Sequence, residues 1–340
     1  MKPVSKNKLL FICKQKHIYS NTTQTQIASG LYNSAQFVVN MLNHNGVQAK
    51  LANVVDGNAV DKEVHLYKPT HVIIEALWVT PDKLKVLTKL HPHVKWIIRL
   101  HSELPFLANE GIAMEWIYQY LDCQNVFISV NSKRMDKQLT ELLKRPIAYL
   151  PNYYPTYDNK KETNHKHHIN IGCFGAIRPL KNQLIQAVSA INFGDNLRKS
   201  IHFHINATRV ESRGEPILKN IENLFANNPK HKLIKHEWMP HHEFVNVIKQ
   251  MDIGMQVSYS ETFNIVTADF VNNNIPVVVS PEIFWVADLY KADPNSVDSI
   301  QTKLEWAWFF GDWKISKFFN KTKLKIYNHN SKVAWLDLFL

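Results

Sequence analysis

Short apolar runs alternate with helix-periodic segments along almost the whole chain. Leu9–Cys13 is an apolar run, and Leu31–Asn45 places its apolar residues on one helical face and stops at Asn45-Gly46. A second apolar run of the same kind, Ile253–Val257, lies far along the chain. Apolar strands that alternate with helices form parallel sheets covered by helices on both faces. The sequence therefore predicts an α/β fold built on parallel sheets.

The alternation occurs twice, with a polar interruption between the two series. We expect strands over residues 9–13, 47–54, 71–76, 95–100, 125–129 and 148–150, and then over 169–174, 200–206, 232–236, 253–257 and 276–280. We expect helices over residues 31–45, 61–67, 81–90, 111–121, 132–143, 180–193, 216–225 and 241–251, with further helix after 260. The two halves are similar in architecture and not in sequence.

The polar interruption divides the chain into two domains. A chain of 340 residues fits two domains of about 150–170 residues each. We predict an N-terminal domain over 1–155, a linker over 156–168 and a C-terminal domain over 169–299. The linker histidines, His165, His167 and His168, are expected to be solvated and not to bind metal. Residues 300–340 are rich in aromatic side chains and are predicted to be helical and to pack back on the N-terminal domain.

Charge and cysteine content limit the class of partner and compartment. Lys and Arg exceed Asp and Glu by 40 − 29, a net charge of +11, which favours nucleic acid, an anionic membrane surface or phosphorylated ligands. Lysines among the C-terminal aromatic residues keep a membrane-surface role open. No apolar run approaches the roughly 20 residues that cross a bilayer, and Leu9–Cys13 is too short for a signal sequence. Three separated cysteines, Cys13, Cys123 and Cys173, indicate reduced thiols in a cytoplasmic protein.

The first candidate site segment follows the opening strand of the second domain. Gly175 permits a tight turn there, and Arg178 and Lys181 follow it near a helix start. Paired cations at such a place neutralise a diphosphate and stabilise it as a leaving group. The alternative is an ordinary charged surface turn.

The second candidate segment runs from Ser258 to Asp269. We expect Glu261 at the start of a helix and Asp269 two turns along it, where a carboxylate binds vicinal ribose hydroxyls. The intervening residues would offer backbone N–H groups to oxyanions; they are Thr262, Phe263, Asn264 and Ile265. The alternative is that Ser260 caps the helix and both acids are solvated.

His101 is the candidate of the first domain. It follows the predicted strand at 95–100, so it would stand at the carboxyl edge of the first sheet, across a cleft from the other two segments. A lone histidine after a strand is more often structural than functional.

These motifs resemble those of GT-B glycosyltransferases, most closely glycosyltransferase family 4. That family has a Gly-x-x-Arg and Lys turn, here Gly175, Arg178 and Lys181, followed by two acids eight positions apart, here Glu261 and Asp269, and then Pro276-Val277-Val278. The resemblance covers about 160 residues. It implies two Rossmann-like domains facing across a cleft.

The resemblance also implies residue roles. Arg178 and Lys181 would bind the donor diphosphate, Glu261 the donor sugar and Asp269 the nucleotide ribose. His101 resembles the donor-contacting histidine, and Ser29-Gly30 resembles what is left of the family's glycine loop. Three positions depart from the pattern: Asp269 replaces a glutamate, and Asn264 and Asn274 stand where glycine is usual.

The resemblance implies a retaining glycosyltransferase that needs a nucleotide-diphosphate sugar and neither a metal nor another cofactor. The net charge and a phage-like or bacterial branch point to a hydroxymethylated pyrimidine in phage DNA as acceptor, which would have to be flipped or single-stranded. A lipid-linked or cell-surface glycan stays open as the rival acceptor. A third hypothesis is a nucleotide-sugar or nucleic-acid binding module without catalysis, motivated by the three departures. The sequence specifies no oligomeric state.

Overall fold

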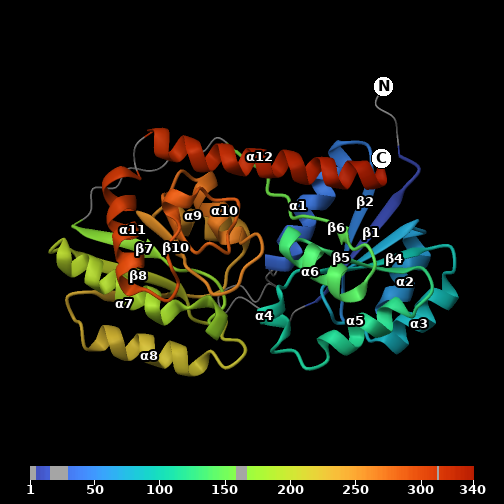
Figure 1. Ribbon diagram of the computed structural model, residues 1–340, viewed down its shortest axis with the longest axis horizontal. Coiled ribbons are helices and arrows are strands. Elements are labelled where there is room, and N and C mark those ends of the chain that lie inside the picture. The colour runs from blue at the N-terminus through green and yellow to red at the C-terminus, as the bar shows by residue number, and fades with distance from the viewer. Residues whose placement is uncertain (1–4, 16–29, 158–166, 312–313) are drawn as a thin grey trace. The chain divides into compact units, whose positions relative to one another are not determined.

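Two parallel β-sheets organise the part of the chain that the computed structural model describes, which is residues 5–15, 30–157, 167–311 and 314–340 (Figure 1). Each sheet belongs to one of two units. Unit 1 contains the described residues 5–15, 30–155 and 328–340, and unit 2 contains 156–157, 167–311 and 314–327. The linker predicted at 156–168 falls mostly outside the described residues, but its last residue, His168, is instead the first residue of a strand, because it pairs with Ser200 of the neighbouring strand.

The sheet of unit 1 has the strand order β2-β1-β3-β4-β5-β6 in the described residues, and its paired strands are parallel. Its strands are β1 (Lys8–Lys14), β2 (Gln48–Val54), β3 (His71–Glu75), β4 (Lys95–Leu100), β5 (Val126–Val130) and β6 (Ala148–Tyr149). Its helices are α1 (Gly30–His44), α2 (Ala59–Tyr67), α3 (Pro81–Leu90), α4 (Leu104–Leu107), α5 (Ala113–Leu121) and α6 (Lys133–Leu143).

Successive side chains along the strands of unit 1 point to opposite faces of the sheet, and both faces are buried. Leu10 and Ile12 belong to a core shared with α2, α3, α5 and α6, whereas Leu9 and Phe11 pack in a second core with α1. Period-two alternation places successive strand residues on opposite faces. Both faces are apolar because both are covered, which is why the strands are continuous apolar runs in the sequence.

The sheet of unit 2 has the order β11-β10-β7-β8-β9 in the described residues and is also parallel. Its strands are β7 (His168–Gly172), β8 (Ser200–Asn206), β9 (Lys232–His236), β10 (Ile253–Gln256) and β11 (Val277–Val279). Its helices are α7 (Gln183–Asn196), α8 (Glu215–Ala226), α9 (His241–Ile248), α10 (Ile265–Asn272) and α11 (Val297–Phe310), with 3₁₀ turns η1 (Pro179–Lys181) and η2 (Asp288–Tyr290).

Helix α10 packs very close to the sheet of unit 2. A β-carbon added to Gly254 of β10 would lie 2.4 Å from the Phe270 ring, and one added to Gly172 of β7 would lie 2.8 Å from it. Only glycine leaves space for the Phe270 ring at these two positions. The helices α7, α8 and α11 supply apolar side chains to a separate core with the same sheet.

The aromatic C-terminal segment is divided between the units. Helix α11 contributes Ile300 and Leu304 to the core of unit 2. Helix α12 (Lys314–Phe339) follows, and its residues up to Tyr327 belong to unit 2, whereas those from Asn328 belong to unit 1. There Trp335 and Phe339 are buried beside Phe11 of β1.

Four predicted elements are confirmed with both of their bounds, namely the strands at 95–100, 200–206 and 232–236 and the helix at 81–90. Most of the others are present with an end shifted by a few residues. Helix α4 was not predicted, since its four residues are too few to show a period. The helix predicted at 180–193 is instead the turn η1 followed by α7, because Asn182 has a φ of 57° and separates them.

Candidate functional site

The turn after β7 needs glycine at its centre. Gly175 has a φ of 119°, a conformation open to few residues with a side chain. Its N–H donates to Asn206 Oδ1 at the end of β8, 2.9 Å away. A β-carbon here would meet its nearest atom only at 3.9 Å, so the constraint comes from backbone conformation and not from space. The predicted tight turn is thus in place.

Arg178 extends from this turn toward a small charged cluster. Its guanidinium lies 3.8 Å from Glu211, whose carboxylate also accepts from Arg209 Nε at 2.7 Å. The Arg209 guanidinium stacks over the Trp238 ring, 4.4 Å from its centroid. Backbone pairing of Ile177 with the segment after β8 holds these side chains together. Arg209, Glu211 and Trp238 were missed in the sequence, where they carry no spacing signal.

Lys181 and Glu261 form an ion pair at the carboxyl ends of the neighbouring strands β7 and β10. Ser258 Oγ donates to the same carboxylate at 3.1 Å, and Tyr259 N–H donates to the Leu180 carbonyl at 2.9 Å. Burial lowers the pKa of Lys181, and the Glu261 carboxylate only partly offsets this, so the pKa lies below its ordinary value. The two predicted donor-binding loops are therefore joined directly, in one unit.

One local prediction is wrong. Glu261 does not begin a helix, because α10 begins four residues later at Ile265, so Glu261 and Asp269 are not two turns apart on one helix. Asn264 is the cap: its side-chain oxygen accepts from the Thr267 N–H at 2.8 Å, and its amide donates to Gln256 at 2.9 Å. Thr262 and Phe263 precede the helix, and the Ile265 N–H is in its first turn, where such groups have no intrahelical partner.

The two asparagines that stand where the resemblance leads one to expect glycine have a physical explanation. Asn264 and Asn274 both have positive φ values, 57° and 58°. Asparagine adopts this conformation more readily than other residues with a side chain, so both substitutions preserve the backbone that glycine would allow.

Phe263 fixes the loop that carries Glu261. Its ring is buried between Trp285 and Tyr327, at centroid distances of 5.6 and 4.8 Å, and its carbonyl accepts from Trp285 Nε1 at 2.7 Å. The side chain of Phe263 is thus structural. Tyr327 comes from α12, so this helix supports the loop.

Asp269 is buried and is bound by a histidine. Only 1% of it is exposed, and its carboxylate accepts from His241 Nε2 at 2.7 Å, at the start of α9. Burial lowers the pKa of His241, but the hydrogen bond and charge of Asp269 outweigh it, and the pKa lies above its ordinary value. His241 carried no signal in the sequence. The His241 side chain is partly exposed, whereas the Asp269 carboxylate that it binds is buried.

His101 follows β4 and is bonded to Glu75, at the end of the neighbouring strand β3, within unit 1. Because a carboxylate only accepts, His101 Nε2 carries the proton and Nδ1 is the acceptor, with the Asn131 amide 3.4 Å away. Burial lowers the pKa of His101 more than Glu75 raises it, so the pKa lies below its ordinary value and the ring is neutral at pH 7.

A buried arginine holds Glu75. Arg99 is fully buried and donates to both oxygens of Glu75 at 3.1 and 3.2 Å, to the Leu150 carbonyl at 2.9 Å and to Asn152 at 2.8 Å. Burial raises the pKa of Glu75, but Arg99 and His101 outweigh it and the pKa lies below its ordinary value. A charged residue that ends an otherwise apolar strand was the available signal for Glu75.

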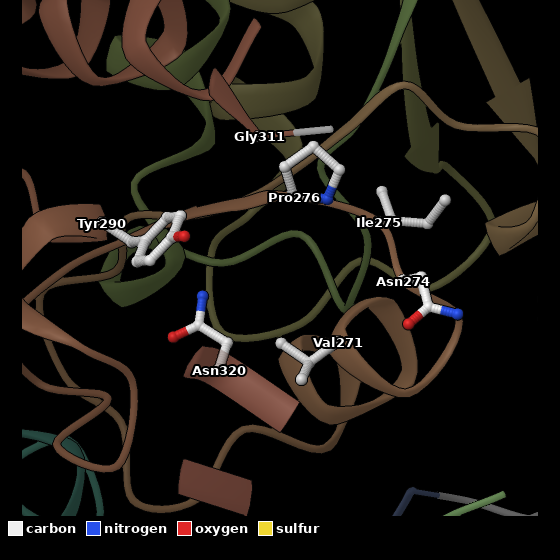
Figure 2. A pocket seen from close by; sticks show the side chains of 7 residues that line it. All are labelled: Val271, Asn274, Ile275, Pro276, Tyr290, Gly311 and Asn320. Atoms are coloured by element: carbon white, nitrogen blue, oxygen red, sulfur yellow. The ribbon is translucent and has the colours of Figure 1, made fainter. Parts of the chain in front are cut away.

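Other predicted features lie elsewhere. Gly30 is the first residue of α1, and the preceding Ser29 lies outside the described residues. Figure 2 shows a small pocket in unit 2 that contains none of the predicted site residues. It is lined by Val271, Asn274, Ile275, Pro276, Tyr290, Gly311 and Asn320. Among the described residues, no cluster of acidic, histidine or cysteine side chains suits a metal ion.

Comparison with known proteins gives structural matches only. No protein-family profile and no curated protein matches the chain. Sucrose-phosphate synthase from Thermosynechococcus elongatus matches with a TM-score of 0.70 and 10% identity, over 98% of this chain and 98% of that chain. Anabaena HepE, in complex with UDP and glucose, matches with a TM-score of 0.64 and 10% identity, over 96% and 95%. Trehalose 6-phosphate synthase from Burkholderia multivorans matches with a TM-score of 0.66 and 9% identity, over 96% and 94%.

These matches confirm the predicted fold class. The chain has the α/β fold with two Rossmann-like domains that characterises GT-B proteins, and the matched chains are covered almost end to end. At such identities the likeness concerns the fold, and the chemistry has to be argued from the side chains.

Proposed function

We propose that this protein is a glycosyltransferase that uses a nucleotide-diphosphate sugar, from a phage or bacterial branch of glycosyltransferase family 4. The observation that supports this most directly is the joining of Lys181 and Glu261, with Arg178 near by, at the carboxyl ends of adjacent parallel strands. Ligands of open α/β sheets bind at that edge. UDP and glucose bound to a protein of the same fold are consistent with this donor class.

In this proposal Lys181 and Glu261 bind each other until a donor arrives, and each then binds a part of the donor. Lys181 turns from Glu261 to a donor phosphate, and Glu261 is then free to accept hydrogen bonds from sugar hydroxyls. Arg178 provides the second cation, and the first-turn N–H groups of α10 add donors for phosphate oxygens. Without a donor, the ion pair therefore neutralises two largely buried charges that would be costly if they were unpaired.

The reaction would proceed on one face of the sugar. The bond between the anomeric carbon and the diphosphate oxygen breaks, and the diphosphate keeps the electron pair, stabilised by Arg178 and Lys181. The acceptor hydroxyl bonds to the anomeric carbon on the same face and passes its proton to the leaving phosphate oxygen, which gives retention. His101 would accept a hydrogen bond at Nδ1 from the donor sugar. No metal or other cofactor takes part in this proposal.

The ribose contact requires a change from the family pattern. Asp269 is one methylene shorter than glutamate and is held by His241. We propose that Asp269 reaches the ribose through this imidazole or through water. The three cysteines are free and buried, which fits the proposed cytoplasmic location.

A hydroxymethylated pyrimidine of phage DNA is the proposed acceptor, and the net charge of +11 supports it. A lipid-linked or cell-surface glycan is the second candidate, and the lysine-rich helix α12 favours it. Mass spectrometry of DNA and glycans from cells that express the wild type or Glu261→Ala separates the two. The mass of the added sugar should be found in either the DNA or the glycans of cells with the wild type, and should be absent from that same fraction in cells with the variant.

Two variants of the ion pair test the donor site. Lys181→Met should weaken UDP binding at least 10-fold in titration calorimetry, because a phosphate loses a buried cation. Glu261→Gln should bind UDP at least as tightly as the wild type, because the competing carboxylate is gone, but should transfer no sugar from UDP-glucose or from other nucleotide sugars.

The proposal fails if Lys181→Met binds every nucleotide diphosphate tested as the wild type does. Binding of a nucleotide sugar by the wild type with no release of nucleotide, with every acceptor tried, would favour the non-catalytic binding module instead. Lys89→Met, an exposed lysine at the end of α3, is the matched control and should change neither measurement.

A further inference from the structure

The outward face of α12 in unit 2 combines exposed apolar side chains with lysines. Phe318 is 67% exposed, Phe319 is 55% exposed and Ile326 is 53% exposed, and Lys323 and Lys325 are exposed beside them. We call these five residues the α12 outer face. Large apolar side chains grouped on a surface in this way generally mark an interaction site.

The opposite side of the same helix is fixed by contacts. Leu324 is fully buried, and Tyr327 is buried against Phe263 and Phe284. Asn320 accepts from the Ala287 N–H at 3.2 Å, and Figure 2 shows its side chain directed toward the pocket. The helix is therefore held in one rotation about its axis, and the outer face is its solvent side.

Helix geometry arranges the outer face as an apolar strip with a lysine on each border. At about 100° per residue, Phe318, Ile326 and Phe319 lie at roughly 0°, 80° and 100° around the axis. Lys325 lies at roughly −20° and Lys323 at roughly 140°, so one ammonium group borders each side. Long lysine side chains in such positions reach phosphate groups while the apolar residues between them enter a lipid layer.

The positive charge of α12 indicates which kind of partner the outer face binds. From Lys314 to Trp335 the sequence contains six lysines and no aspartate or glutamate. DNA would meet the lysines but would not bury three exposed apolar side chains between them, and an acidic protein would do so only with an apolar patch bordered by acids. An anionic lipid surface does both, because its headgroups carry the negative charge and the region beneath them is apolar.

We propose that the α12 outer face docks this protein on the surface of an anionic bilayer, with Phe318, Phe319 and Ile326 inserted at headgroup level. Among the described residues, no helix is long and apolar enough to cross a bilayer. The proposed contact is made by side chains at headgroup level. The docking requires no donor, acceptor or turnover, so it stands or falls independently of the proposed glycosyl transfer.

Sedimentation with lipid vesicles tests the proposal. The full chain should bind vesicles of phosphatidylcholine with one third phosphatidylglycerol at least 10-fold more tightly than vesicles of phosphatidylcholine alone. Phe318→Ser with Phe319→Ser should weaken that binding at least 10-fold. Lys323→Glu with Lys325→Glu should weaken it by a similar factor at low salt and by less at 0.5 M salt. Both double variants should unfold at the wild-type temperature, since the changed side chains face solvent.

Matched controls distinguish binding through the α12 outer face from non-specific hydrophobic binding and from an effect of net charge. Leu66→Ser with Leu90→Ser removes two side chains of similar exposure, 63% and 57%, from other helices, and Lys89→Glu with Lys219→Glu makes the same change of net charge on α3 and α8. Neither control should change vesicle binding more than twofold. Equal loss in the variants and the controls would overturn the proposal, as would a wild type that does not bind the anionic vesicles. It would also be overturned if the lysine variant lost binding to duplex DNA while the phenylalanine variant bound vesicles normally.

Discussion

Replacing Arg99 with methionine should destabilise unit 1 by about 3–5 kcal/mol, the cost of breaking a buried ion pair by removing one partner. The Arg99 guanidinium donates four hydrogen bonds that are fully buried, two of them to Glu75. It also lies 5.2 Å from the centroid of the Trp335 ring. Methionine fills much of the volume of the arginine side chain but makes no hydrogen bond to Glu75. Of the two side chains that bind this carboxylate, Arg99 and His101, only His101 would remain.

Urea unfolding measures the loss, and hydrogen exchange of β3 and β4 peptides assigns it to unit 1. Adding Glu75→Gln to Arg99→Met should recover at least about a third of the loss, because the unpaired buried charge is then gone. The reasoning is refuted if Arg99→Met costs less than about 1 kcal/mol, or if the two substitutions simply add.

The same pair sets a pH dependence. The pKa of Glu75 is lowered from its ordinary value of 4.5, so its contribution to stability is complete above pH 4.5 and is lost as the pH falls through the lower pKa of the folded state. The wild type should therefore lose stability on acidification below pH 4.5, and the Arg99→Met, Glu75→Gln variant should lose less.

Three further outcomes are expected, each measured by urea unfolding. Gly175→Ala should cost about 1–2 kcal/mol, because its φ of 119° is unfavourable for alanine, and should weaken UDP binding as well. Gly254→Val should cost about 1–3 kcal/mol or more, because its side chain would overlap the Phe270 ring. In the wild type, protonated His241 bound to Asp269 should add stability that is complete below pH 6.5 and is lost as the pH rises through its raised pKa. His241→Gln should remove this pH dependence.

The sheets were predictable because the sequence signal for them is local. Strands buried on both faces are continuous apolar runs, and β4 and β8 have the predicted bounds for that reason. Glycine at position 175 and the two cations after it were likewise predictable, since a tight turn after a strand is a short-range pattern. Because β10 was also recognised as a strand, Glu261 could be placed after the end of a strand in the same domain, but not beside Lys181.

The pairing of side chains was not predictable, since it depends on which strands are adjacent. Glu75 and Arg99 are opposite each other in the register of β3 and β4, 24 residues apart in the chain. His241 and Asp269 come from two helices, and no spacing rule connects them. The start of α10 was misplaced for a different reason: the cap is Asn264, and an earlier serine offered an equally good cap by residue type.

The ion pair between Lys181 and Glu261 has a consequence for the order of binding. Both side chains are largely buried, so Lys181 can leave the carboxylate only when another anion takes its place. Under the proposed function, Glu261 becomes available to sugar hydroxyls only after a diphosphate has arrived. Glucose should therefore bind the wild type at least 10-fold more tightly with saturating UDP than without it. In Glu261→Gln, where no pair has to be broken, UDP should change glucose affinity less than threefold, and equal coupling in the two proteins would show that the pair does not control access.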